Sequence, residues 1–420
     1  MLKVETLSNG LKLLVFPMTN TEACTLLLLV RTGSKYETKN LNGISHLLEH
    51  LLFRGTKNWP DPSAIARELD AVGGLYNAFT DKEMLGVWIK TDSKDLCLTS
   101  KILKDMTSCP LFEEKEILKE KKVIAEEINM RQDTAQIMVL DLWEKLLYGN
   151  QPAGWEVIGT KSSLDAISQN DLFRHLKDFF VSRNAVLVLA GKVSEKQVRD
   201  VKALFSDLKD SSVKKKPLVR ENQSKPEILL QFKQTDQTHI CLGVRGFGVF
   251  SRERYVLAVL ATILGGMMSS RLFEEIRERR GLAYYLRTTS EHYTDTGFLT
   301  THAGLSNSKV AEAVEIICQE YRKIKLQKIS QKELTKAKEN LRGHLFLGLE
   351  TSDEFASFYG VQKIMEREVL TPEQEWQNIA KVSQNDILKV AKQVFRPNRL
   401  NLAIIGPHKS KQDFLRKLKI

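Results

Sequence analysis

The sequence lacks the features that mark several large classes of protein. No run of apolar residues approaches the length of about 18 that a membrane-spanning helix requires, and the apolar run at 25–30 is far too short. The N-terminus has neither the apolar core of a signal peptide nor an Arg/Ser-rich transit segment. We therefore expect a cytoplasmic protein that has no membrane segment.

Cysteine is also scarce, and the cysteines do not have the spacing of a metal site. The five cysteines are an odd number without a CxxC pair: Cys24, Cys97, Cys109, Cys241 and Cys318. This pattern argues against a disulfide framework and a cysteine zinc site, and it predicts free thiols in a reducing compartment. Histidine occurs eight times in 420 residues, so two histidines at a functional spacing are informative.

The charge of the chain is basic, with a formal net charge of +11. Such an excess can indicate nucleic acid, an acidic membrane surface or acidic substrates. The basic residues are spread along the chain, and the one tight cluster, 214–216, stands in a polar stretch without an accompanying aromatic and basic module. We interpret the charge as general surface charge and expect no nucleic-acid partner.

The length of the chain predicts more than one domain. A chain of 420 residues exceeds what one hydrophobic core usually holds, and 42% hydrophobic residues supply ample material for two. The polar stretch at 207–226, which contains two prolines and a lysine run, is a natural boundary. We predict an N-terminal domain at 1–210, a linker at 211–226 and a C-terminal domain at 227–420.

The two halves repeat a similar order of local patterns. Strand patterns are expected at 4–7, 11–16, 24–30, 75–90 and 185–190 in the first half, and at 228–232, 240–244 and 400–405 in the second. Helical patterns follow at 46–52, 62–72, 94–103, 113–131, 133–147, 194–208, 252–264, 269–280, 309–326 and 331–347. The expected fold class is α+β, with two homologous domains that each form a mostly antiparallel sheet covered by helices.

The segment His46-Leu47-Leu48-Glu49-His50 is the strongest chemical signal in the sequence. On a helix, residues four apart share a face, so both imidazoles can bind one zinc ion. Glu49 lies beside them and can take a proton from water at the metal, where the pKa of water falls to about 7. This is the logic of the HExxH zinc peptidases in reverse order. The alternative is a coincidental amphipathic helix with two histidines and a glutamate.

A catalytic zinc needs a third protein ligand, and a carboxylate is as suitable as histidine. The helical pattern that begins at 113 offers six candidates: Glu113, Glu114, Glu116, Glu120, Glu126 and Glu127. The residues alone leave the choice among these glutamates open.

The motif, with Leu51-Leu52-Phe53-Arg54-Gly55-Thr56 behind it, resembles the pitrilysin/insulinase family of inverted-motif (HxxEH) zinc peptidases. The family spacing of 76 intervening residues implies Glu127 as the third ligand, and Glu120, seven residues earlier, as a residue that orients the ligands. Glu126 competes with Glu127, but it has Lys119 seven residues before it and points about 100° away on the helix.

The same resemblance implies a substrate-binding strand. Gly74 with Asn77-Ala78-Phe79-Thr80 looks like the family's edge strand, to which a peptide can add as an extra strand through main-chain hydrogen bonds. The alternative is plain sheet structure. The following strand, at 85–88, departs from the family's usual residues and leaves the side-chain preferences open.

The second half carries a segment similar to the family's C-terminal domain. Arg277 and Tyr284 are seven residues apart and match the pair that contacts the substrate carbonyl and its developing oxyanion. The alternative for Arg277 is a solvated charged helix face. The second half has no HxxEH, and the equivalent position, 256–261, reads as core.

The resemblance implies a zinc endopeptidase that encloses extended peptides or unfolded polypeptide segments between two facing halves. Members of this length form that clamshell by pairing two chains, so we expect a homodimer with Zn²⁺ as cofactor. Two alternatives are a catalytic subunit that needs a different homologous partner chain and a noncatalytic scaffold member of the same family. A nucleic-acid-binding module is a distant third.

Overall fold

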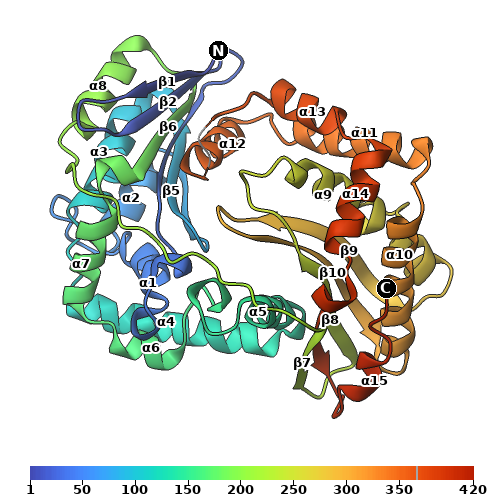
Figure 1. The fold of residues 1–420 in the computed structure, drawn as a ribbon. Helices are drawn as coiled ribbons and strands as arrows, with labels where there is room; N and C mark the ends of the chain where they lie inside the picture. The colour runs from blue at the N-terminus through green and yellow to red at the C-terminus, as the bar shows by residue number, and fades with distance from the viewer. Residues whose placement is uncertain (366–367) are drawn as a thin grey trace. The chain divides into compact units, whose positions relative to one another are not determined.

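The computed structural model describes residues 1–365 and 368–420, which form two compact units (Figure 1). Unit 1 comprises Met1–Asn129, Trp155–Pro217 and Gly348–Val369. Unit 2 comprises Met130–Gly154, Leu218–Leu347 and Leu370–Ile420. The units are therefore not two consecutive stretches of the sequence.

Unit 1 contains a six-stranded sheet with the order β1-β2-β6-β3-β5-β4. Its strands are β1 (Lys3–Thr6), β2 (Lys12–Pro17), β3 (Ala23–Val30), β4 (Leu75–Thr80), β5 (Leu85–Asp92) and β6 (Ala185–Gly191). The pair β2 and β6 is parallel, and the other pairs are antiparallel.

Unit 2 contains a five-stranded sheet with the order β7-β11-β8-β10-β9. Its strands are β7 (Glu227–Phe232), β8 (Gln237–Arg245), β9 (Ala283–His292), β10 (Gly297–Ser306) and β11 (Asn401–Gly406). The pair β7 and β11 is parallel, and the others are antiparallel. Strands β7 to β11 thus repeat the chain order, neighbours and directions of β2 to β6. This confirms the predicted α+β fold with two homologous, mostly antiparallel sheets.

The helices repeat in the same way. The first half contains α1 (Ile44–Leu51), α2 (Ala64–Ala71), α3 (Leu96–Ser108), α4 (Glu114–Asp133), α5 (Ala135–Tyr148), α6 (Lys161–Ala166), α7 (Gln169–Phe179) and α8 (Glu195–Phe205). The second half contains α9 (Glu253–Ala261), α10 (Val310–Leu326), α11 (Gln331–Leu347), α12 (Ser352–Met365), α13 (Pro372–Ala380), α14 (Gln384–Val394) and α15 (Gln412–Leu415). Even the caps recur, because capping boxes at Thr160 and Ser168 begin α6 and α7, and boxes at Thr371 and Ser383 begin α13 and α14.

Short turns complete the secondary structure. The 3-10 segments are Ser34–Tyr36, Lys39–Leu41, Ser93–Asp95, Pro152–Gly154, Ser182–Asn184, Asn307–Lys309 and Pro397–Arg399. Two π-helical turns are present, η6 (Thr262–Gly266) and η7 (Phe273–Glu278). The first lies at the end of the helix predicted at 252–264, and the second lies within the helix predicted at 269–280.

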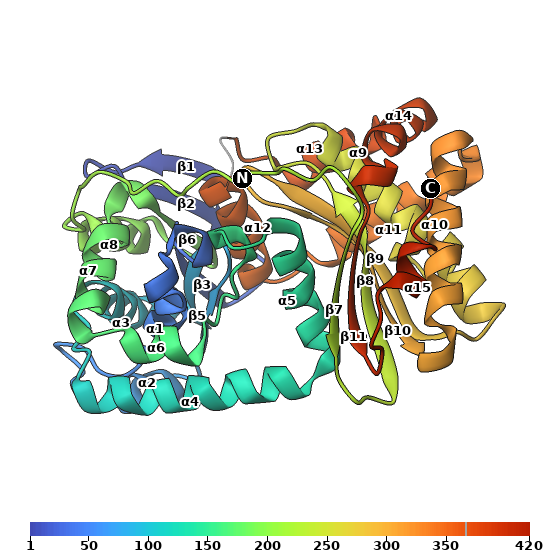
Figure 2. The same cartoon turned by 60° about the horizontal axis from the view of Figure 1, so that its bottom comes forward.

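The two units exchange one equivalent helix each. Helix α12 belongs to unit 1 and packs on β3 and β6, although it comes from the second half of the chain (Figure 1). Helix α5 belongs to unit 2 and packs on β11, β8 and β7, although it comes from the first half (Figure 2). The compact units therefore differ from the contiguous domains 1–210 and 227–420 at these two helices. The physical reason is that each sheet buries both faces, and the second face is covered by the exchanged helix.

Strand β3 shows why unit 1 needs helix α12. Every residue of 24–30 is buried, although side chains alternate between the two faces of a sheet. Leu26 and Leu28 join the main core of unit 1, whereas Leu27 and Leu29 lie near Gly360 of α12. A continuous apolar run is what a strand covered on both faces requires.

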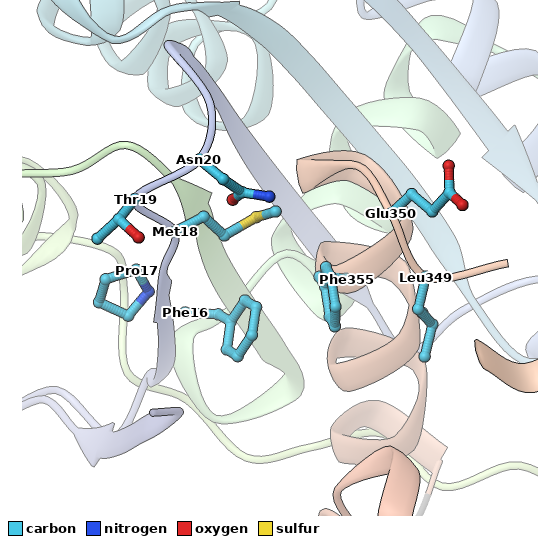
Figure 3. Close-up of a pocket in the computed structure, with 8 residues that line it drawn as sticks. All are labelled: Phe16, Pro17, Met18, Thr19, Asn20, Leu349, Glu350 and Phe355. Atoms are coloured by element: carbon cyan, nitrogen blue, oxygen red, sulfur yellow. The ribbon is translucent and has the colours of Figure 1, made fainter. Parts of the chain in front are cut away.

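Aromatic contacts extend this second layer. The ring of Phe16 on β2 stacks on Phe355 of α12 with ring centroids 4.5 Å apart. The two rings also line an open pocket with Met18 and Leu349 (Figure 3). The aromatic contact holds the first turn of α12 against the end of strand β2.

The predicted linker at 211–226 has no helix or strand, and each end is attached to one unit. Lys216 pairs with the buried carboxylate of Glu83 in unit 1 at 3.2 Å. In unit 2, the backbone NH of Val219 donates to Asp295 and the buried guanidinium of Arg245 bonds to Gln223. Lys216 is therefore not part of a general basic surface, because its ammonium compensates a buried charge.

No helix in the described part of the chain is long and apolar enough to cross a membrane.

Truncation of Trp143 in α5 should weaken unit 2, although Trp143 stands in the first half of the sequence. Its side chain is 1% exposed and packs edge-to-face on Phe298. We expect Trp143→Ala to cost about 3–5 kcal/mol and to raise hydrogen exchange in β8 and β11. The matched control, Leu140→Ala on the exposed side of α5, should change stability by less than about 1 kcal/mol. Faster exchange in β3 and β6 instead would contradict the exchange of helices.

Candidate metal centre

Helix α1 presents its polar residues because its apolar residues are buried. Ile44, Leu47, Leu48 and Leu51 lie in the core of unit 1. Since these residues occupy one side of the helix, His46 and His50 are left together on another side, four residues apart. Their rings are in edge contact, with centroids 4.8 Å apart. The predicted helix is confirmed, and it places both imidazoles together.

The N-terminus of α1 is held by the buried carboxylate of Glu37. This carboxylate accepts hydrogen bonds from the backbone NH groups of Gly43 and Ser45, at 2.8 and 3.0 Å, and from the Asn42 amide at 2.9 Å. A negative charge is favourable at a helix N-terminus, where NH groups lack partners within the helix. Burial nevertheless raises the pKa of Glu37 above its ordinary value. These contacts fix where α1 starts and therefore where its histidines point.

Glu127 on α4 completes a three-residue cluster with the histidines. Its Oε2 atom lies 3.7 Å from His46 Nε2 and 3.9 Å from His50 Nε2. The three ligand atoms lie within 4.8 Å of one another. In a tetrahedral zinc site with bonds of about 2.0–2.1 Å, ligand atoms stand about 3.4 Å apart. The cluster could therefore hold a metal ion after small side-chain shifts, and His46, His50 and Glu127 fit zinc by donor type and spacing.

Glu120 contacts the ring nitrogen of His50 that does not face Glu127. Its side chain is 1% exposed, and its carboxylate accepts a hydrogen bond of 3.0 Å from His50 Nδ1. The other oxygen pairs with Arg54 Nε at 2.7 Å. Because a carboxylate only accepts, His50 carries its proton on Nδ1 and leaves Nε2 for a metal. The structure thus places Glu120 where the sequence predicts an orienting residue.

The charges around Glu120 and His50 shift their pKa values in opposite directions. Burial raises the pKa of Glu120, but the hydrogen bond from His50 and the charge of Arg54 outweigh it, so the pKa is lowered. Burial lowers the pKa of His50, but the bond to Glu120 and the nearby carboxylates outweigh it, so the pKa is raised. The Glu120 carboxylate is therefore stabilised in its charged form.

Glu49 lies beside the cluster as a largely buried carboxylate. Thr80, the last residue of β4, donates a hydrogen bond of 2.6 Å from its hydroxyl to Glu49 Oε2. Burial raises the pKa of Glu49, and the nearby charge of Glu127 also raises it. The hydrogen bond from Thr80 and the charge on His50 lower this pKa, but the net shift is upward. A raised pKa is typical of carboxylates that accept and return protons near neutral pH.

Strand β4 is an edge strand, as predicted for the substrate-binding strand. It stands last in its sheet and pairs, within the described part of the chain, with β5 on one side. Gly74 precedes it, and Asn77 is exposed. Ala78 is buried and lies on the same face of the strand as Thr80. The Phe79 ring lies over Gly86, and a Cβ atom added to Gly86 would stand 2.4 Å from this ring. The Phe79 side chain thus packs on the sheet.

Arg277 and Tyr284 belong to unit 2. Arg277 stands in the π-helical turn η7, with its guanidinium 4.8 Å from the centroid of the Phe273 ring. Tyr284 is 66% exposed near the start of β9. Strand β9 ends the sheet of unit 2 and is the counterpart of β4.

Comparisons with known proteins identify the family of the chain. A family model described as insulinase (peptidase family M16) matches residues 14–161, and one described as peptidase M16 inactive domain matches 166–341. The uncharacterized zinc protease YmxG of Bacillus subtilis is 32% identical over 97% of this chain and 98% of its own length. The chain belongs to peptidase family M16, the insulinase family. This confirms the predicted family.

Further relatives match this M16 chain over most of their own length, and solved structures share its fold. An uncharacterized zinc protease of Streptomyces coelicolor is 32% identical over 97% of this chain and 90% of its own. The crystal structure of a protease from Helicobacter pylori matches with a TM-score of 0.90 at 24% identity, over 97% of this chain and 99% of that one. A chain of complex III from Candida albicans matches with a TM-score of 0.84 at 18% identity and full coverage of both chains. The solved structures support the fold.

The second half of the M16 chain lacks the donor residues of the first. Helix α9 is the counterpart of α1 in the repeated order, and its sequence, ERYVLAVLA, contains no histidine. Leu257, Leu260 and Ala261 are buried in the core of unit 2. The duplication therefore keeps the fold in both halves and the candidate metal donors in the first half alone.

Three residues of the site were not assigned a role from the sequence. Thr80 bonds Glu49, Arg54 pairs with Glu120, and Glu37 caps α1. Thr80 and Arg54 stand inside recognised segments, but their partners are far away in sequence. No local spacing indicates such contacts, so the structure was needed to find them.

Replacement of Glu127 should remove metal binding, and replacement of its neighbour Glu126 should not. Glu126 is exposed on another side of α4, where it accepts from Asn129. We expect Glu127→Ala to weaken Zn²⁺ binding at least 100-fold, because two imidazoles are left without a carboxylate ligand. Competition with a chromophoric chelator measures the affinity. Equal losses in Glu126→Ala and Glu127→Ala would show that the donor is misassigned.

Proposed function

We propose that this M16 chain is a zinc-dependent endopeptidase that hydrolyses peptides and unfolded polypeptide segments bound in extended form. The proposal rests on one observation: the ligand atoms of His46, His50 and Glu127 lie within 4.8 Å of one another, with the Glu49 carboxylate beside them. Three protein donors with a free fourth position are typical of catalytic zinc, whereas structural sites use four protein ligands.

His46, His50 and Glu127 would hold the zinc ion, which would act as a Lewis acid and lower the pKa of water to about 7. Glu49 accepts the proton of the attacking water and then passes it to the leaving amine. His50 is kept in the correct tautomer by Glu120. His46 and Glu127 complete the donor set from α1 and α4. Each of these roles needs a fixed side chain, and α1 and α4 are regular helices with a buried charged contact between them.

The edge strand β4 supports the proposed substrate class. A peptide that adds to its free edge forms main-chain hydrogen bonds, which depend little on side-chain sequence. Thr80 at the end of this strand contacts Glu49, so the strand leads directly to the proposed base. We therefore propose that Gly74, Asn77, Ala78 and Phe79 line the path of an extended substrate.

Two alternatives stay in view. The chain could require a different homologous partner chain for activity, or act as a noncatalytic scaffold. The complete set of donor, base and orienting residues favours a catalytic chain, because a scaffold has no need for five converging charged or metal-binding side chains. Formation of a homodimer stays a prediction from the sequence.

The Glu49→Gln variant should bind Zn²⁺ like the wild type and lose hydrolysis. Glutamine keeps the size of the side chain and cannot accept a proton, so we expect kcat to fall on the order of 10²–10⁴-fold. Metal analysis and cleavage of an unfolded polypeptide by the purified chain measure both properties.

The purified wild-type chain serves as the control for the partner alternatives. Cleavage by the chain alone, at a rate that follows its zinc content, supports the proposal. A chain that binds zinc but stays inert until a homologous partner is added would support the first alternative. Hydrolysis by Glu49→Gln at the wild-type rate would remove Glu49 from the mechanism.

We also propose that Arg277 and Tyr284 stabilise the substrate carbonyl as it gains negative charge. Arg277→Lys and Tyr284→Phe should each lower kcat/KM by about 10–1000-fold while zinc content stays unchanged, because such donors act on the transition state. The matched control is Tyr255→Phe, at a partly buried tyrosine of unit 2 whose hydroxyl bonds Glu375. An effect in Tyr255→Phe as large as that in Tyr284→Phe would point to a loss of stability instead.

A further inference from the structure

Thr80 makes an unusual contact for a residue at the end of an edge strand. Its hydroxyl lies 2.6 Å from Glu49 Oε2, and the next nearest acceptor, the carbonyl oxygen of Ser45, is 3.5 Å away. A hydroxyl has one proton to donate, so this geometry directs it to Glu49. Among the hydrogen bonds of the described residues, the bond from Thr80 is the one that reaches the Glu49 carboxylate.

The backbone that follows Thr80 is held firmly. Asp81 NH bonds to Met84 O at 2.8 Å and closes the turn between β4 and β5. Glu83 in this turn is buried and pairs with Lys35 at 2.8 Å and with Lys216 at 3.2 Å. A buried carboxylate with two ammonium partners is costly to move, because any displacement leaves a charge uncompensated. The contacts of this turn therefore hold the end of β4 in place.

Close packing adds to this support. Gly33 has a φ of 104°, and a Cβ at this position would stand 2.0 Å from the carbonyl oxygen of Asp81. The turn thus approaches the backbone of Gly33 too closely for any side chain. Lys35 NH also donates to Lys82 O at 2.9 Å. The position of the Thr80 backbone is thereby set by contacts that lie outside strand β4.

The Glu49 side chain needs such a constraint. A glutamate on a helix has three rotatable bonds, and a carboxylate that only pointed toward solvent would sample several rotamers. Thr80 engages Oε2 and leaves Oε1 without a hydrogen bond from the described residues. A carboxylate bound at one oxygen presents the other in one direction, which is what transfer of a proton between water and amine requires.

We propose that Thr80 is a positioning residue, which holds the Glu49 carboxylate in the orientation needed for proton transfer while the turn at 81–84 holds Thr80. This inference rests on the proposed peptidase function and adds a residue to it. Thr80 touches neither the metal-binding donors nor the substrate by this contact; it acts through Glu49.

The pair Thr80→Val and Thr80→Ser separates the hydroxyl from the side-chain shape. Valine keeps the β-branched shape and removes the donor, whereas serine keeps the donor and removes a methyl group. We expect Thr80→Val to lower kcat on the order of 10–100-fold, to change KM by less than about 3-fold and to leave zinc content unchanged. Thr80→Ser should retain kcat within about 3-fold of the wild type.

Two kinetic outcomes would overturn the inference. One is a wild-type kcat in Thr80→Val; the other is a rise in KM at constant kcat, which would assign Thr80 to substrate binding. Equal losses of kcat in Thr80→Val and Thr80→Ser would also overturn it, since packing and not the hydroxyl would then be responsible.

Crystal structures of the metal-free variants give a readout that is independent of activity. Glu49 should leave its present rotamer in Thr80→Val and keep it in Thr80→Ser. An unmoved Glu49 carboxylate in Thr80→Val contradicts the inference even if kcat falls. A zinc-loaded wild-type chain that cleaves no peptide would refute the proposed function, while these crystal structures would still decide whether Thr80 holds Glu49.

Discussion

The buried carboxylate of Glu120 is the contact on which the metal centre depends. It lies on α4 and binds His50 of α1 on one side and Arg54, just beyond α1, on the other. An ionised carboxylate in the interior is tolerated when both oxygens have charged or hydrogen-bonded partners. This requirement fixes α1 against α4. Glu127, two helical turns after Glu120 on the same side of α4, is then brought beside the histidines.

The duplicated fold explains how one half can specialise without loss of structure. Strands β7 to β11 repeat the order of β2 to β6, and each sheet is covered on its second face by the helix that the other half supplies, α12 or α5. Since the sheets and the exchanged helices provide the stability, α1 can carry a polar cluster that contributes little to the core. Its counterpart α9 carries apolar residues at the same place and joins the core of unit 2. The exchange also means that neither half of the sequence can by itself cover both faces of its own sheet.

Much of the candidate site was predictable because its residues follow local rules. His46 and His50 stand four apart on a helix, and Glu120 and Glu127 stand seven apart on another, so each pair shares a face. The choice of Glu127 over Glu126 needed the family spacing, because both helices had to be placed relative to each other. The contacts of Thr80 with Glu49 and of Arg54 with Glu120 were not predicted, since the partners are 31 and 66 positions apart in the sequence.

The sequence by itself determined the types of the elements that carry the candidate site, and it indicated the chemistry of that site. Periodic apolar residues specify strands and helices, and a His-x-x-Glu-His segment specifies a pair of metal donors with a base. Only the tertiary structure decided which sheet each helix covers. The pattern of α5, predicted as a helix at 133–147, shows a buried side but not its partner, because any apolar sheet face of the right shape satisfies it. Likewise, long-range contacts such as Thr80 to Glu49 and Lys216 to Glu83 arise when distant segments meet, and no local pattern encodes them.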